Sequence, residues 1–325
     1  MLKPLFKSIA VRSGAPSLVR AARGSAFRIL MYHRFPGEAG QMEEHLAAQC
    51  QHLRRNYEPV SMRQAGAALA GGERLPDRAL AITVDDGYAD FQRGWKVFRA
   101  HRLPVTLYAV SGFIDRKLWL WPDVVHYALS HARIPAITVP IRGAEPFVHS
   151  LGNADERKAA EIGLDARLIE APNEARVAAI DALPEITGVE IPGEFSEGTA
   201  PLTWEQLRDL AQEGAEIGAH TIHHPILSRL ESTEALRDEI GGSKRRVEEA
   251  MGRPVLHFCF PNGKEPDYTE ETRAIVRECG FQTAVNAQRG LNRKGADATN
   301  LRRIGVDPST PLERFQMEVA GFRMP

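Results

Sequence analysis

Short apolar runs recur along the chain, and each is followed by turn-forming residues and then by a segment with helical periodicity. This alternation is typical of α/β proteins. The runs are almost continuously apolar, which favours strands covered on both faces over a half-exposed antiparallel sheet. Seven runs predict seven strands, at residues 27–33, 80–84, 104–110, 216–220, 255–260, 281–285 and 301–306.

The segments between these runs carry apolar stripes that predict helices packed on the strands. Phe91, Trp95 and Phe98 recur at i, i+4 and i+7, so they are expected on one buried helix face. Thr203 followed by Gln206 resembles a capping box, which predicts that a helix begins there.

One stretch, at about 115–201, is far longer than a single connection between a strand and a helix requires, and we interpret it as an insertion. Segments 124–131 and 176–182 within it are expected to be helical, and prolines interrupt the rest. The predicted organisation is a basic N-terminal segment at 1–26, followed by one domain at 27–325 that carries this insertion after its third strand.

The amino-acid composition excludes some classes of binding partner and of site. The chain has 43% hydrophobic and 26% charged residues, which describes a globular protein with a large core. Its 41 Lys and Arg residues balance 42 Asp and Glu residues, so no global field attracts nucleic acid. The three cysteines are odd in number and widely spaced, so they predict neither a disulfide framework nor a Cys-based zinc site.

The chain has no window near the roughly 18 apolar residues that a membrane span needs. Basic residues interrupt the first two dozen positions, unlike the apolar core of a secretory signal, so a cytoplasmic location is expected. Segment 1–26 has helical apolar spacing with lysines between. It could contact the inner membrane face peripherally or pack as a helix on the protein body, and both interpretations stay open.

Two adjacent carboxylates, Asp85 and Asp86, stand where the second predicted strand breaks into a turn at Gly87. Two ionised carboxylates that face one pocket repel each other unless a cation lies between them. An Asp-Asp-Gly sequence by itself is also an ordinary turn, and this alternative stays open.

Three histidines follow the fourth predicted strand, in His220-Thr221-Ile222-His223-His224. Imidazoles at positions 220 and 224 can converge on one ion from a loop. The helical metalloprotease motif has a glutamate after its first histidine, whereas this chain has Thr221 after a strand-like segment, so that interpretation fails.

Together the two elements supply two imidazoles and a carboxylate, a set that leaves coordination positions for water and substrate. The second carboxylate could then accept a proton from the metal-bound water.

These residues resemble the motifs of the polysaccharide deacetylase family, which has the NodB homology domain and is also called carbohydrate esterase family 4. The resemblance rests on 83–87 (TVDDG), 220–225 (HTIHHP), 260–263 (FPNG) and 30–34 (LMYHR), and it covers about residues 27–310 apart from the insertion. It implies a distorted seven-stranded (β/α) barrel with the site at the carboxyl ends of the strands, in agreement with the strand count above.

The resemblance also implies roles for individual residues. Asp85 would be the general base, while Asp86, His220 and His224 would hold one divalent metal ion, most simply zinc, with cobalt, nickel or iron as alternatives. His223 would not be a ligand.

The chain departs from the family pattern at two points. Cys259 stands where many members carry an arginine, and the late segment 301–306 lacks the histidine that serves as general acid. His33, on the first predicted strand, is our candidate for that acid; a packed histidine at a strand end is the alternative. Because the chain lacks these two groups, a catalytically degenerate carbohydrate-binding protein stays open as an alternative interpretation.

The leading hypothesis is metal-dependent hydrolysis of the N-acetyl amide of an amino sugar in a polysaccharide or glycan precursor, possibly lipid-linked, for the cell envelope. Backbone N–H groups near Tyr88 or Asn262, beside Pro261, would stabilise the oxyanion. Trp121 could stack on a sugar ring or fasten the insertion to the barrel. Hydrolysis of an O-acetyl ester is an alternative, since the same activated water attacks esters. No obligate protein partner is evident.

Overall fold

The computed structural model describes residues 19, 24–38, 40–196 and 198–322. The N-terminal segment predicted at 1–26 falls almost wholly outside the described residues. No described helix is both long and apolar enough to cross a membrane.

Seven parallel strands close into a barrel, in the order β1, β10, β9, β8, β7, β4, β3, and β3 pairs with β1 to complete the ring. Each lies within or overlaps one predicted run, so the predicted distorted seven-stranded (β/α) barrel is confirmed. A two-residue strand, β2 (Glu58–Pro59), adds to the start of β3. The seven strands are β1 (Arg28–Tyr32), β3 (Ala79–Val84), β4 (Val105–Ala109), β7 (Glu216–Ala219), β8 (His257–Cys259), β9 (Thr283–Arg289) and β10 (Leu301–Gly305).

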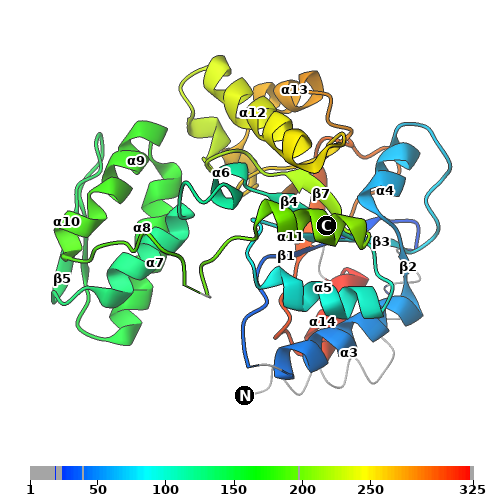
Figure 1. Ribbon diagram of the computed structural model, residues 1–325, viewed down its shortest axis with the longest axis horizontal. Coiled ribbons are helices and arrows are strands. Elements are labelled where there is room, and N and C mark those ends of the chain that lie inside the picture. The colour runs from blue at the N-terminus through cyan, green and yellow to red at the C-terminus, as the bar shows by residue number, and fades with distance from the viewer. Residues whose placement is uncertain (1–18, 20–23, 39, 197, 323–325) are drawn as a thin grey trace.

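Helices cover the outside of the barrel (Figure 1). Phe91, Trp95 and Phe98 are buried on one face of α5, as their spacing predicts. The Thr203–Gln206 capping box is present at the start of α11. The outer helices are α3 (Gln41–Asn56), α4 (Met62–Leu69), α5 (Phe91–Ala100), α11 (Trp204–Gln212), α12 (Thr233–Met251), α13 (Glu270–Glu278) and α14 (Leu312–Ala320); α6 (Ser111–Ile114), η1 (Leu227–Arg229) and η2 (Glu265–Asp267) are single turns.

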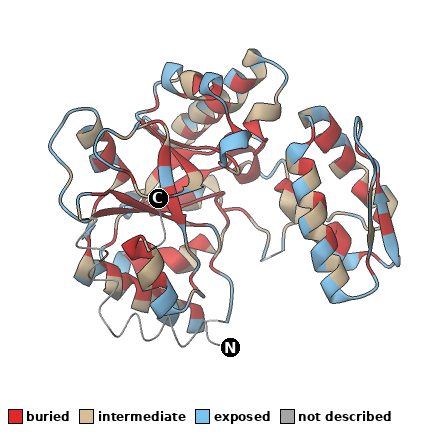
Figure 2. Ribbon diagram, turned by 180° about the vertical axis from the view of Figure 1, so that it is seen from behind, coloured by how far each residue is buried: buried red, intermediate tan, exposed pale blue. Residues whose placement is uncertain are grey.

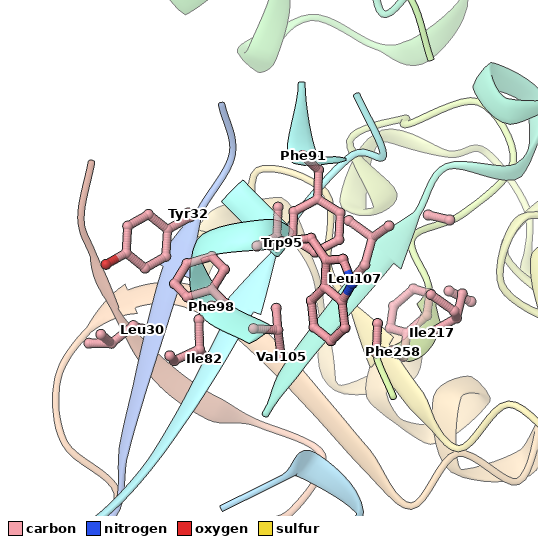
Figure 3. Packing of buried hydrophobic residues seen from close by; sticks show 14 of the residues in the cluster. Leu30, Tyr32, Ile82, Phe91, Trp95, Phe98, Val105, Leu107, Ile217 and Phe258 are labelled. Carbon is pink, nitrogen blue, oxygen red and sulfur yellow. The ribbon is translucent and has the colours of Figure 1, made fainter. Parts of the chain in front are cut away.

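Side chains alternate across the barrel wall because successive residues of a strand point to opposite faces. Leu30, Ile82 and Leu107 belong to the cluster that packs against the helices, part of which Figure 3 shows. Their strand neighbours Ile29 and Ala81 belong to a separate, smaller cluster inside the barrel. The inward positions therefore form a continuous column toward the carboxyl ends of the strands.

The insertion folds around its own hydrophobic cluster, beside the barrel (Figures 1 and 2). The helices expected at 124–131 and 176–182 are present. A third, over 17 residues, was missed because its buried face consists of little more than Ala160, Leu164 and Leu168. The elements are α7 (Trp121–His131), the antiparallel pair β5 (Ala136–Val139) and β6 (Phe147–Ser150), α8 (Ala154–Glu170), α9 (Asn173–Asp181) and α10 (Leu183–Thr187).

Candidate metal and catalytic site

The two adjacent carboxylates follow β3 at its carboxyl end. Asp85 continues the strand, and its N–H donates to Tyr32 O on β1 at 3.0 Å. Asp86 then has a φ of +77°, followed by Gly87 at +99°, and this left-handed turn brings the second carboxylate back over the barrel. The positive φ favours glycine at this position, and a Cβ there would also displace the Ile114 Cδ1 methyl, which would lie 2.8 Å away.

The histidine loop follows β7 and is held in an unusual backbone conformation. Thr221 and His224 both have positive φ, at +65° and +54°, and the Thr221 hydroxyl accepts from His224 N–H at 3.1 Å. Glu239 on α12 accepts from the N–H groups of Ile222 and His223 and lies 2.6 Å from His223 Nδ1. His223 is therefore directed toward α12, while His220 and His224 turn inward. Strained backbone of this kind concentrates at functional sites.

Asp86, His220 and His224 form one buried cluster. Asp86 Oδ1 lies 3.4 Å from His220 Nε2 and 3.6 Å from His224 Nε2. One nitrogen or oxygen from each residue falls within 4.8 Å of the others. His220 Nδ1 lies 2.8 Å from Cys259 O, which fixes a proton on Nδ1 and turns the Nε2 lone pair toward Asp86.

The protonation states of the two imidazoles in the cluster are compatible with the binding of a cation. Burial, and then the neighbouring His220, lower the pKa of His224 to about 3, so its imidazole is neutral. Burial lowers the pKa of His220, but Cys259, Asp86 and Asp85 outweigh it and raise that pKa well above its usual value. A divalent ion would displace that proton. Two imidazoles and one carboxylate, all buried, fit a divalent transition metal with open coordination positions.

Asp85 is held by a residue that the sequence did not single out. Arg303, on β10, donates from Nη1 and Nη2 to the two carboxylate oxygens at 2.6 and 2.7 Å. The guanidinium also donates to Thr83 Oγ1 at 3.0 Å and to Asn286 O at 2.7 Å. Burial raises the pKa of Asp85, but the charges of Arg303 and His33 outweigh it, so the pKa lies below its usual range.

The guanidinium beside Asp85 comes from β10, whereas Cys259 stands at the position where the motif pattern has an arginine. Cys259, which stands at that motif position, lies 3.1 Å from Arg303 Nη2 and 3.5 Å from Asp85 Oδ2. The cation that pairs with Asp85 therefore lies on a different strand, β10, from the motif position on β8. The sequence indicates this arginine only weakly. Arg303 follows Leu301 by two residues in one strand, so both side chains point to the same, inward side of the barrel wall.

His33 follows β1 and reaches the same carboxylate from the solvent side. Its Nε2 lies 3.6 Å from Asp85 Oδ2, and 45% of its side chain is exposed. It is thus an accessible imidazole at the mouth of the site rather than a packed histidine.

Tyr88 lies under the rim of the site, on the turn after Asp86. Its hydroxyl donates to Asp123 Oδ2 of α7 at 2.8 Å, and the guanidinium of Arg34 lies 3.8 Å from its ring centroid. These contacts tie the insertion to the barrel next to the carboxylates. The Tyr88 N–H donates to no acceptor within the described part of the chain.

The remaining candidates occupy two different places. Pro261 and Asn262 follow β8 in a tight turn in which Gly263 N–H donates to Pro261 O and Asn262 has a φ of +56°. Trp121 lies in the hydrophobic cluster of the insertion with 8% of its surface exposed. Its ring therefore packs within the insertion and offers no open stacking face, and the cluster contains no described residue of the barrel that it would fasten to the insertion.

Comparisons with known proteins concern the family and the fold of the chain. The sequence model described as polysaccharide deacetylase matches residues 72–284. The putative polysaccharide deacetylase YxkH of Bacillus subtilis is 29% identical over 35% of this chain and 39% of its own length. The poly-beta-1,6-N-acetyl-D-glucosamine N-deacetylase of Escherichia coli is 38% identical over 19% of this chain and 10% of its own. The chain thus matches well under half the length of these relatives.

Two solved structures share the fold. A Streptococcus pyogenes deacetylase, PplD, in complex with acetate has a TM-score of 0.59 at 15% identity, over 90% of this chain and 98% of that one. IcaB from Ammonifex degensii has a TM-score of 0.58 at 17% identity, over 91% and 98%. At such identities the likeness concerns the fold, whereas the sequence match covers more than half of the chain. This chain belongs to the polysaccharide deacetylase family.

Proposed function

We propose that this protein hydrolyses the N-acetyl amide of an amino sugar in a polysaccharide or a glycan precursor. The observation that carries the proposal is the buried cluster of Asp86, His220 and His224 next to a second carboxylate, Asp85. The E. coli relative is named as a deacetylase of an N-acetylglucosamine polymer, which supports the same substrate class.

Asp86, His220 and His224 would hold one divalent metal ion. When bound, such an ion lowers the pKa of a coordinated water toward about 7 and polarises a carbonyl. Zinc suits these ligands, and cobalt, nickel and iron are the alternatives. The bond from His220 Nδ1 to Cys259 O orients the imidazole for this role.

Asp85 would accept the proton of the attacking water. Arg303 fixes both of its oxygens and keeps the carboxylate ionised, so it is a positioned base before substrate arrives. His33, near Asp85 Oδ2 and open to solvent, would donate the proton that the departing amine needs. Arg303 and His33 beside Asp85 support an active enzyme over the alternative of a degenerate carbohydrate-binding protein.

The oxyanion would be stabilised by backbone N–H groups. The N–H of Tyr88 is on the turn that carries Asp86, and Asn262 is on the turn after β8, so both stand at the carboxyl ends of the strands. Pro261 and the ring of Tyr88 would shape the adjoining surface for the sugar.

The test is acetate release from N-acetylglucosamine oligomers and from an O-acetyl ester, with metal-reconstituted protein whose metal content is measured. Asp85→Asn should lower amide turnover by about 100-fold or more with metal still bound. Asp77→Asn, at an exposed aspartate of the same chain, is the control and should retain wild-type turnover. Near-normal turnover by Asp85→Asn would exclude it as the base. Ester hydrolysis alone would favour the esterase alternative, and no bound metal would favour a binding protein.

A further inference from the structure

The loop between His220 and His224 is bound to the outer helix α12 through a single carboxylate. Glu239 Oε2 accepts from the N–H groups of Ile222 and His223 at 2.9 and 3.0 Å. The other oxygen, Oε1, lies 2.6 Å from His223 Nδ1. Only 12% of the Glu239 side chain is exposed, so water has little access to the carboxylate. One residue of α12 therefore contacts the two residues that lead to His224.

A second element binds the same loop through its carbonyl groups. The N–H of Ser111, at the start of α6, donates to Thr221 O at 3.1 Å. The N–H of Gly112 donates to Ile222 O at 3.0 Å. A Cβ on Gly112 would lie 2.6 Å from that oxygen, so only glycine lets the two backbones come this close. The loop is thus held on both sides, its carbonyls by α6 and its N–H groups by α12.

The side chain of Ile222 also lies against α12. A Cβ on Gly242, one turn after Glu239, would lie 2.7 Å from Ile222 Cδ1. Glycine is unfavourable in the interior of a helix, yet α12 has Gly241 and Gly242 in succession at its middle. The bare backbone at 242 gives the Ile222 side chain room on the helix, which fixes the loop relative to Glu239.

The loop needs such support because its backbone is strained. Thr221 and His224 have φ values of +65° and +54°, a left-handed conformation that costs free energy in residues other than glycine. Such conformations persist only where the surrounding contacts enforce them. Without the bonds to Glu239 the loop could relax, and His224 Nε2 would no longer be held 3.6 Å from Asp86 Oδ1.

We propose that Glu239 is a positioning residue that sets the affinity of the site for its metal ion. It holds the loop in the strained conformation before the ion arrives, so that His224 already faces Asp86. This rests on the proposed function, because it concerns the same metal site. Glu239 is not one of the three ligand residues, so its loss should weaken metal binding while every ligand remains. Partners that orient metal ligands in this way typically change metal affinity by about 10–100-fold.

The binding test measures the dissociation constants of zinc and cobalt with metal-free protein. Glu239→Ala should raise both about tenfold or more, whereas Asp238→Ala, at the exposed neighbour on α12, should change neither. Glu239→Gln keeps an oxygen for the two backbone N–H groups and should restore most of the affinity. Equal affinities in the wild type and Glu239→Ala would overturn the proposal.

A fourth variant separates position from charge. Glu239→Asp keeps the negative charge but withdraws the carboxylate by one methylene group, so it should bind metal more weakly than Glu239→Gln. The reverse order would show that the charge of Glu239 attracts the ion, and it would overturn a positioning role. This comparison needs no alanine variant, so it decides the matter even where Glu239→Ala does not fold.

The kinetic test measures acetate release from N-acetylglucosamine oligomers as zinc is added. The zinc concentration for half-maximal rate should rise about tenfold or more in Glu239→Ala and stay at the wild-type value in Asp238→Ala. A lower maximal rate at an unchanged half-maximal concentration would overturn the proposal. Affinity is read without turnover, so a wild type that binds zinc but releases no acetate would refute the deacetylase function alone. A wild type that binds no metal would overturn both.

Discussion

The ion pair between Arg303 and Asp85 gives the sharpest prediction. Arg303→Lys keeps a positive charge on β10 but replaces the planar fork with a single ammonium. A lysine cannot donate to both oxygens of Asp85 and also to Thr83 and Asn286, which Arg303 does at 2.6–3.0 Å. The carboxylate would remain ionised but would no longer be held in one orientation.

The magnitude follows from the burial of the pair. Both side chains are about 97% or more buried, so unpaired groups cannot turn to water. Arg303→Met leaves a buried carboxylate alone, which costs about 3–5 kcal/mol of folding stability. Arg303→Lys should cost about 1–3 kcal/mol because the charge is kept and some hydrogen bonds are lost. A misplaced base should lower kcat by about 100-fold.

Urea denaturation and acetate release measure these two effects separately. Arg302→Met, at the exposed neighbour on the same strand, is the matched control and should change neither. Adding Asp85→Asn to Arg303→Met should restore part of the lost stability, because no buried charge then remains. Adding Cys259→Arg should restore part of the activity, since Cys259 Sγ lies 3.5 Å from Asp85 Oδ2. A loss below about 0.5 kcal/mol in Arg303→Met, within the range of ordinary surface changes, would refute this reasoning.

Three further predictions concern the metal, the acid and the insertion. His220→Ala should lower bound metal below stoichiometry in elemental analysis, whereas His131→Ala, at an exposed histidine, should not; full occupancy in His220→Ala would exclude it as a ligand. His33→Gln should lower amide hydrolysis about 100-fold and ester hydrolysis less, because an alkoxide leaves more easily than an amine anion; equal losses would contradict a role as general acid. Burial, and then Glu161, raise the pKa of Asp165 to about 7, so the folded state keeps this proton to a higher pH than the unfolded chain and loses stability as pH rises from about 4 to 7. Asp165→Asn should therefore gain roughly 1–2 kcal/mol over the wild type at pH 8, and less at pH 4, in denaturation curves; a gain independent of pH would show that the charge is not its cause.

The sequence predicts the barrel because its signals are local. Each strand is a short, almost continuously apolar run, and each is followed by turn residues, so periodicity alone locates all seven. The turn after β3 and the loop after β7 are likewise visible, because adjacent carboxylates and clustered histidines are uncommon. Asp86 and His224 lie close together because each follows a parallel strand, and the carboxyl ends of parallel strands lie at the same end of the barrel.

Arg303 and Arg176 show what a local pattern omits. Each occupies a position whose neighbours look ordinary, in an amphipathic strand and in a helix of the insertion. Both are buried, and Arg303 pairs with a carboxylate 218 residues away along the chain. No propensity or spacing rule contains that information. α8 was missed for a related reason, because packing against the rest of the insertion stabilises a helix whose apolar stripe is narrow.

The charge distribution of the site depends on which charged side chains point into the barrel. It does not depend on which sequence motif each of them belongs to. Asp85 directly follows β3, while Cys259 and Arg303 lie on β8 and β10, and the three side chains meet inside the barrel. Because Cys259 Sγ also lies 3.5 Å from Asp85 Oδ2, an arginine introduced at position 259 is expected to start close to the same carboxylate. A closed barrel brings inward side chains of different strands together, which is how a cation on β10 reaches the carboxylate that follows β3 although β8 supplies none there.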